Sequence, residues 1–85
     1  MELKETITSM QSEDYKERFK AEYYQTKIRY EKLKDFNNRI EAAQLVGRPA
    51  PKHDCPLGLL REQQRLMGEY LHTLELRAKI EEIDL

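Results

Sequence analysis

The sequence has little of the residues that interrupt helices or cross-link small folds. Its 85 residues include one cysteine, three glycines, three prolines and no tryptophan. One cysteine cannot form an internal disulfide, and it does not join His53 and His72 at the spacing of a metal site. Few glycines and prolines, with 36% charged residues, are typical of helical bundles and coiled coils rather than of sheets.

The chain also lacks long apolar runs and an excess of one charge. No apolar segment approaches the roughly 20 residues that span a bilayer, and the first residues lack the basic and apolar regions of a signal peptide. Fifteen basic and 16 acidic residues give a net charge of -1, which argues against a protein that binds DNA or RNA mainly through phosphate contacts. We therefore expect a soluble protein of the reducing cytoplasm, without a membrane or nucleic-acid partner.

The longest regular pattern is a stretch without glycine or proline, residues 15–44. Steps of four and three alternate along it, as in a helix that packs against another helix. The positions are Phe19, Tyr23, Thr26, Tyr30, Leu33, Asn37, Ile40 and Gln44. With Ser12 as N-cap and Gly47 after its end, this pattern predicts a helix over 12–45.

A proline-containing connector, 46–55, then leads to a second predicted helix over 56–83, with Pro56 at its first position. Its main apolar seam comprises Leu57, Leu60, Gln64, Met67, Leu71, Leu74, Ala78 and Glu81. A second row comprises Leu59, Leu66, Tyr70 and Arg77, with Leu76, Ile80 and Ile83 nearby. One partner helix cannot cover two apolar rows, so the second row predicts a homo-oligomer.

These elements predict an all-α antiparallel two-helix hairpin that assembles into a homo-oligomeric helical bundle. Residues 1–11 form a separate N-terminal segment, either a short helix or flexible, before the hairpin of 12–85. Facing positions should sum to about 101, which places Asn37 opposite Gln64. Two amides can satisfy each other there and fix the register; the alternative is two solvated side chains.

A candidate ligand site lies at the open end of the expected hairpin. Tyrosines for stacking a base and cations for phosphates gather there: Lys20, Tyr23, Tyr24, Lys27 and Arg77. The register places Arg77 beside both tyrosines. The alternative reading is a core of aromatic residues with lysines that extend past it to water.

No residue pattern predicts catalysis. Cys55 adjoins His53 and Asp54, but adjacent residues rarely share a productive geometry, and His72 has no nucleophile nearby in the sequence. The sequence also has no glycine-rich phosphate loop or metal motif. We expect a protein that is not an enzyme and that needs neither a cofactor nor a metal.

Several segments carry a family resemblance. They are residues 14–18 (DYKER), Glu22-Tyr23, 55–63 (CPLGLLREQ), 67–71 (MGEYL) and 76–81 (LRAKIE). With them the chain resembles short proteins of phages and prophages, especially of gut Firmicutes, related to a crAss-like phage protein. The resemblance covers about residues 13–85, and it implies a phage context and a hairpin without supplying a mechanism.

The architecture also resembles, more loosely, phage sponges that oppose CBASS and Thoeris immunity. Those proteins are compact homo-oligomers that trap cyclic nucleotide signals at subunit junctions with Tyr, Lys and Arg. This likeness is of fold alone, so no binding residue is carried over.

Together these observations predict a phage counter-defence protein in the cytoplasm of the infected bacterial host. It would bind and sequester a small anionic nucleotide signal, of cyclic nucleotide or cyclic ADP-ribose type, without cleaving it. The alternative is a protein–protein inhibitor or scaffold that covers a host defence protein with its second apolar row. A DNA-mimic inhibitor fits the mixed charges poorly.

Overall fold

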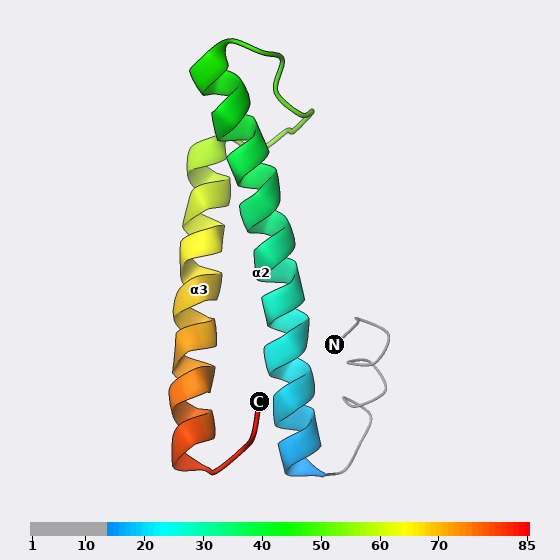
Figure 1. Cartoon of the computed structure of the whole chain (residues 1–85), viewed down its shortest axis with the longest axis vertical. Coiled ribbons are helices and arrows are strands. Elements are labelled where there is room, and N and C mark those ends of the chain that lie inside the picture. The colour runs from blue at the N-terminus through cyan, green and yellow to red at the C-terminus, as the bar shows by residue number, and fades with distance from the viewer. Residues whose placement is uncertain (1–13) are drawn as a thin grey trace.

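The computed structural model describes residues 14–85, which form two long helices, α2 (Tyr15–Val46) and α3 (Leu57–Ile80). The helices run antiparallel side by side and are joined by an extended connector (Figure 1). This arrangement confirms the predicted all-α hairpin. The prediction for residues 1–11 lies outside the described part of the chain.

Helix α2 begins two residues later than its predicted N-cap would place it. Asp14 is the N-cap, and its Oδ1 accepts a hydrogen bond of 3.1 Å from the backbone N–H of Glu17. The prediction of Ser12 was wrong because Asp14 offers both a cap and a negative charge at the positive helix end.

The C-terminal end of α2 confirms the role predicted for Gly47. Its φ of 71° is left-handed, and the N–H of Arg48 reaches back 2.9 Å to the Ala43 carbonyl. This is the bonding of a Schellman cap, in which a glycine avoids the steric cost of a Cβ.

Helix α3 differs from its prediction at both ends. Pro56 has extended backbone angles and is the N-cap rather than the first helical residue. At the other end Glu82 adopts a left-handed φ of 56°, and the N–H of Ile83 donates to the Ala78 carbonyl at 2.8 Å. The turn directs Ile83 into the core, where it is 6% exposed, so its assignment to the outer row was wrong.

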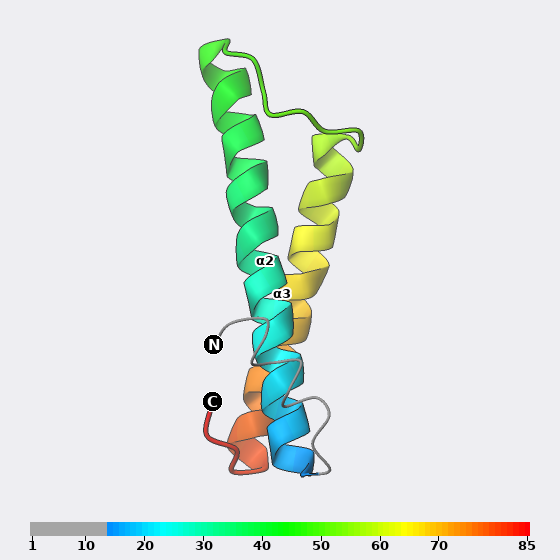
Figure 2. The same ribbon diagram turned by 90° about the vertical axis from the view of Figure 1, so that its right-hand side faces the viewer.

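The apolar core is concentrated at the end of the hairpin that lies away from the connector. It comprises Phe19, Tyr23, Leu71, Leu74, Ala78 and Ile83, with Tyr24 and Tyr30 packed against it. Figure 2 shows that the two helices cross closely there and lie farther apart toward the connector. No helix within residues 14–85 is long and apolar enough to cross a membrane.

A polar layer joins the helices above this core. The buried Asn37 donates through Nδ2 to Gln64 Oε1 at 3.1 Å and to the Leu60 carbonyl at 3.2 Å. Arg61 adds a third bond, from Nη1 to Gln64 Oε1 at 2.7 Å. The predicted amide pair and register are therefore confirmed, and the pair belongs to a larger network between the helices.

Candidate functional site: a groove beside Tyr30

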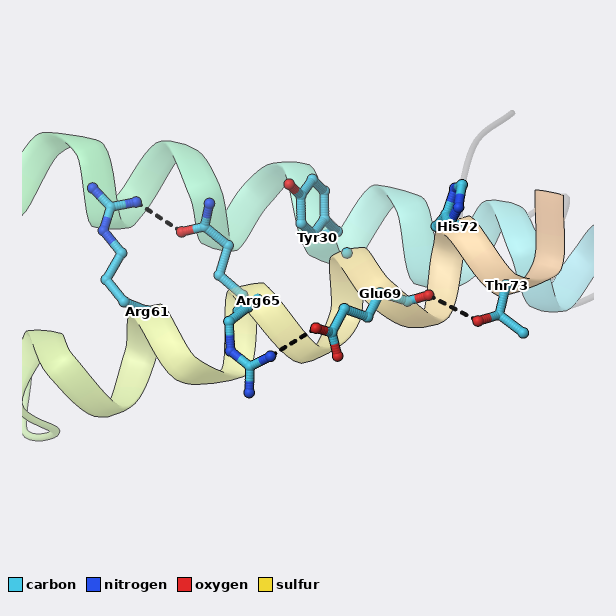
Figure 3. A pocket seen from close by; sticks show the side chains of 8 residues that line it. Tyr30, Arg61, Arg65, Glu69, His72 and Thr73 are labelled. Carbon is cyan, nitrogen blue, oxygen red and sulfur yellow. Dashed lines mark hydrogen bonds and ion pairs between the residues drawn. The ribbon is translucent and has the colours of Figure 1, made fainter. Parts of the chain in front are cut away.

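A glycine in the middle of α3 marks the site. An interior glycine costs a helix about 1 kcal/mol relative to alanine, so it calls for a structural reason. At Gly68 the reason is Tyr30 of α2, because a Cβ added at Gly68 would lie 3.2 Å from Tyr30 Cε1. The missing side chain lets the half-buried Tyr30 ring rest against the α3 backbone, as Figure 3 shows.

A groove opens around this contact. This open groove has a volume of about 860 Å³, within the usual range of small-molecule sites. Its lining residues are Tyr30, Arg61, Gln64, Arg65, Gly68, Glu69, His72 and Thr73. We call this the Tyr30 groove.

The Tyr30 groove continues into a smaller hollow toward the apolar core. The two share Tyr30, Gly68 and His72. The hollow adds Tyr23, Lys27, Glu31, Leu71 and Glu75. One continuous surface therefore places two arginines on one side of Tyr30 and Lys27 on the other.

Arg61 is fixed at the connector end of the groove. Its side chain is only 28% exposed, and it bonds Gln64 Oε1, Asn38 Oδ1 at 3.0 Å and Glu41 Oε1 at 3.5 Å. These contacts from both helices hold a planar guanidinium in one orientation, which suits recognition of a phosphate or carboxylate.

Arg65 lies one helical turn further on and is held by two carboxylates. It bonds both carboxylate oxygens of Glu62 and one oxygen of Glu69, the latter at 2.7 Å. The hydrogen bonds that Arg65 donates to the Glu62 carboxylate raise the pKa of Arg65 and lower the pKa of Glu62. Arg65 is charged at every physiological pH, and an anionic ligand must share it with these glutamates.

Three of the predicted site residues come together beside the groove. Tyr23 is 5% exposed, and its hydroxyl donates to Glu75 Oε2 at 2.6 Å. Tyr24 meets the Tyr23 ring edge-on, with centroids 5.1 Å apart, and Lys27 Nζ lies 5.8 Å from the Tyr23 centroid. Lys20 is one turn earlier on α2. Burial makes Tyr23 a core residue that borders the hollow, so its ring is not free to stack a base.

Arg77 does not join them. Its guanidinium donates to the Tyr15 hydroxyl at 2.7 Å and to Glu81 at 3.1 Å, and its central carbon lies 5.0 Å from the Phe19 ring centroid. The predicted neighbourhood of Arg77 was therefore wrong. Side chains two residues apart on an α-helix point about 200° apart around its axis. Because Glu75 lines the hollow beside the groove, Arg77 lies on the opposite edge of the helix pair.

The residues considered for catalysis lie apart. Cys55 is exposed, and the His53 ring bonds the Pro51 carbonyl at 2.8 Å and meets Phe36 edge-on. His72 lines the groove. The described residues contain no group of three or more His, Cys, Asp or Glu side chains that could hold a metal ion.

Sequence reasoning missed the residues at the centre of the groove. The heptad pattern places Tyr30 only in the seam, and it does not mark Arg61, Arg65 or Gly68 as site residues. A usable signal was present: by the predicted register Gly68 nearly faces Tyr30, and a glycine opposite an aromatic residue indicates close approach of a ring to a helix backbone.

Fold and site together define a small all-α hairpin protein with an open, ligand-sized groove along its helix pair. A family model described as Sequestin matches residues 13–80, and the protein belongs to the Sequestin family. No curated protein and no solved structure matches the chain. The expected relationship to a crAss-like phage protein therefore stays a prediction.

Proposed function

We propose that the protein binds a small anionic nucleotide-derived signal in the Tyr30 groove and sequesters it without cleaving it. The family name, Sequestin, supports sequestration of a ligand. The choice of ligand rests on the order of groups along the groove. The Tyr30 ring lies against the backbone at Gly68, with Lys27 on one side and Arg61 and Arg65 on the other. Aromatic faces stack bases, and guanidinium groups bind phosphates.

The proposed roles follow from the geometry of each side chain. Tyr30 stacks the base because it is the aromatic residue whose ring lines both parts of the groove. Arg61, Arg65 and Lys27 receive the negative charges of the phosphates. Tyr24, with Lys20 one turn away, borders the Lys27 end and is a peripheral contact at most. Arg77 is left out of the proposed site because its guanidinium is bonded to Tyr15 and Glu81.

The biological setting belongs to the same proposal. A protein that holds a cyclic nucleotide or cyclic ADP-ribose signal lowers its free concentration, which would silence a defence system of an infected bacterium that responds to it. We propose that the protein is such a phage counter-defence protein, acting in the host cytoplasm as a homo-oligomer. Binding alone suffices for this role, provided that binding sites outnumber signal molecules.

A calorimetric screen tests the proposal. Cyclic dinucleotides, cyclic trinucleotides and cyclic ADP-ribose isomers are titrated into the full chain, and bound ligand is recovered after heat denaturation. At least one class should bind at micromolar concentration and be recovered intact. Silence from every class at tens of micromolar ligand would refute the proposal, and recovery of a hydrolysed product would replace sequestration with catalysis.

Two arginines provide a matched pair for the same assay. Arg65 and Arg39 are both exposed and both paired with a carboxylate four residues away, but only Arg65 lines the Tyr30 groove. Arg65→Ala should weaken binding by about tenfold or more. Arg39→Ala should leave it unchanged, and equal losses in both variants would point to general charge attraction instead of the groove.

A second function is favoured by one observation. Leu59, Leu66 and Tyr70 on α3 are 60%, 51% and 43% exposed, a surface that could cover a host defence protein. Such an inhibitor or scaffold would retain one stoichiometric host partner in pull-downs after Lys27→Ala and Arg77→Ala. A sequestering protein would retain no such partner.

A further inference from the structure

Helix α2 is covered on a face that does not point toward α3. Ala21 lies two residues from both Phe19 and Tyr23, which belong to the core between the helices. Two residues correspond to a rotation of about 200° around the helix axis, so Ala21 points away from α3. Ala21 is nevertheless 0% exposed, and Ile28, seven residues further on, is half-buried. We call Ala21, Tyr24 and Ile28 the outer face of α2.

Residues 14–85 do not account for this burial. Within that range the other helix is α3, which lies along the opposite side of α2 (Figure 1), and the tail after α3 turns into the core at Ile83. Large apolar side chains that lie uncovered on the hairpin are far more exposed, such as Leu45 at 79% and Ile80 at 81%. The cover of the outer face therefore comes from another part of the chain.

The sequence before Asp14 carries an apolar row that matches the outer face. Its steps are four and three residues, and the outer face has the same two steps in reverse order. Both rows span seven residues, or about 10 Å at the helical rise of about 1.5 Å per residue. Run antiparallel, they meet in three pairs: Met10–Ala21, Ile7–Tyr24 and Leu3–Ile28.

The start of α2 suits such a reversal of the chain. Asp14 has extended backbone angles, φ -72° and ψ 119°, so the helix does not continue before Tyr15 along its own axis. Residues 11–14 are left for the turn, and about two to five residues join antiparallel helices. An apolar row that ends at Met10 can therefore begin its contact with α2 at Ala21.

The outer face is also hollowed where the far end of this row would lie. A groove there has a volume of about 370 Å³. Its lining residues are Tyr24, Lys27, Ile28, Glu31 and Lys32. The two large apolar side chains in this lining are the ones that the antiparallel register pairs with Ile7 and Leu3.

We infer that residues 1–11 dock antiparallel on the outer face of α2, in the register of these three pairs. Helix α2 is then packed on two sides, by α3 and by the N-terminal segment. Tyr24 becomes a packing residue between that segment and Tyr23, whose ring it meets edge-on, and it is not available to stack a base. The inference stands on burial and spacing and does not depend on the proposed function.

Cysteine cross-linking in a Cys55→Ser background tests the register. Leu3→Cys with Ile28→Cys should form a disulfide within one chain under mild oxidation, detected by mass spectrometry after alkylation. Leu3→Cys with Arg29→Cys closes a loop of nearly the same length, but Arg29 is exposed and points about 100° away from Ile28. This control should form its disulfide about tenfold more slowly, because the two Cβ atoms do not meet.

Equal rates for the two pairs would overturn the inference. So would a disulfide that forms between two chains instead of within one, because it would place a second copy on the outer face.

Two alanine substitutions test the cover with the native N-terminal segment in place. Ala21→Glu puts a carboxylate beneath the docked segment and should lower the melting temperature by about 4–8 °C or more. Ala42→Glu, the same change at an exposed alanine of α2, should shift it by less than about 2 °C. Equal melting temperatures for the two variants would show that the outer face is open and would overturn the inference.

Discussion

At the scale of single residues, Tyr23 links the core to the site. It is packed with Leu71, Leu74 and Ala78, yet its hydroxyl reaches Glu75 at the edge of the hollow that contains Lys27. Burial, followed by the hydrogen bond to Glu75, raises the pKa of Tyr23 to about 12. An ionised Tyr23 is therefore disfavoured in the folded protein.

This pKa predicts a loss of stability in alkaline solution. The pKa of Tyr23 in the folded protein lies above its unfolded value of about 10. The contribution of the protonated Tyr23 to the free energy of unfolding is therefore complete below pH 10 and disappears as pH rises toward 12. Between about pH 9 and pH 11 the wild type should lose about 1 kcal/mol more than Tyr23→Phe, measured by urea unfolding. Identical pH profiles for the two proteins would show that Tyr23 titrates normally.

Gly68 and Gly58 give a matched pair of substitutions. A Cβ at Gly68 meets Tyr30 at 3.2 Å, whereas one at Gly58 meets nothing within 4 Å. Gly68→Ala should displace Tyr30 by a few tenths of an ångström and weaken nucleotide binding severalfold. Its helix-propensity gain of up to about 1 kcal/mol should be largely offset by that contact. Gly58→Ala should bind normally, and a Gly68→Ala protein with wild-type affinity would remove Tyr30 from the site.

At the scale of helices, both α2 and α3 are followed by a residue with a left-handed backbone conformation, but only one of these residues is a glycine. Gly47 adopts φ 71° without a Cβ, but Glu82 adopts φ 56° with one. The fold tolerates this at Glu82 because the turn directs Ile83 into the core. A left-handed non-glycine residue costs about 1–2 kcal/mol.

Glu82→Gly should therefore stabilise the hairpin. The gain should be about 0.5–1 kcal/mol, because the steric relief exceeds the entropy that glycine adds to the unfolded chain. The melting temperature of Glu82→Gly is compared with that of Glu69→Gly, a change in the interior of α3 that should destabilise the helix. A fall in melting temperature for Glu82→Gly would contradict the left-handed turn.

The polar layer of Asn37 and Gln64 gives another prediction at this scale. Replacing both by leucine removes the buried Asn37 amide and its half-buried partner Gln64 from the seam and should raise the melting temperature. The same change should broaden the oligomer distribution in light scattering, because the apolar seam no longer specifies one register. An unchanged, narrow distribution would show that the layer does not determine assembly.

The hairpin and its register could be predicted from the sequence, whereas the ends of the helices could not, for physical reasons. Heptad spacing and the connector length determine the hairpin and the pairing of Asn37 with Gln64. The helix ends were less certain because Ser12 and Asp14 are both good caps, and because a left-handed Glu82 has no sequence signature.

At the scale of the whole molecule, the site was harder to predict than the fold. A register of facing residues does not say on which edge of the pair a side chain lies. Arg77 and Tyr23 could thus be paired by position and still lie on opposite edges. Lys27 was placed correctly because its neighbours are on its own helix, whereas the groove around Tyr30 depends on the missing side chain of Gly68.

The two edges of the hairpin carry different surfaces. The Tyr30 groove holds cations around an aromatic ring, and the row of Leu59, Leu66, Tyr70 and Ile80 is apolar and uncovered. The first is proposed to bind the signal, and the second is the surface through which the sequence predicts a homo-oligomer. Variants on one edge should therefore change affinity, and variants on the other should first change oligomeric state.

Whether the nucleotide binds in the Tyr30 groove is tested most directly by a nitrogen-15 NMR titration of the full chain with the nucleotide that binds most tightly in the calorimetric screen. We expect the largest amide shifts at Gly68, Arg65 and His72, with little change at Arg39. Shifts concentrated around Arg77 and Tyr15, or in the connector near His53, would contradict a site in the Tyr30 groove.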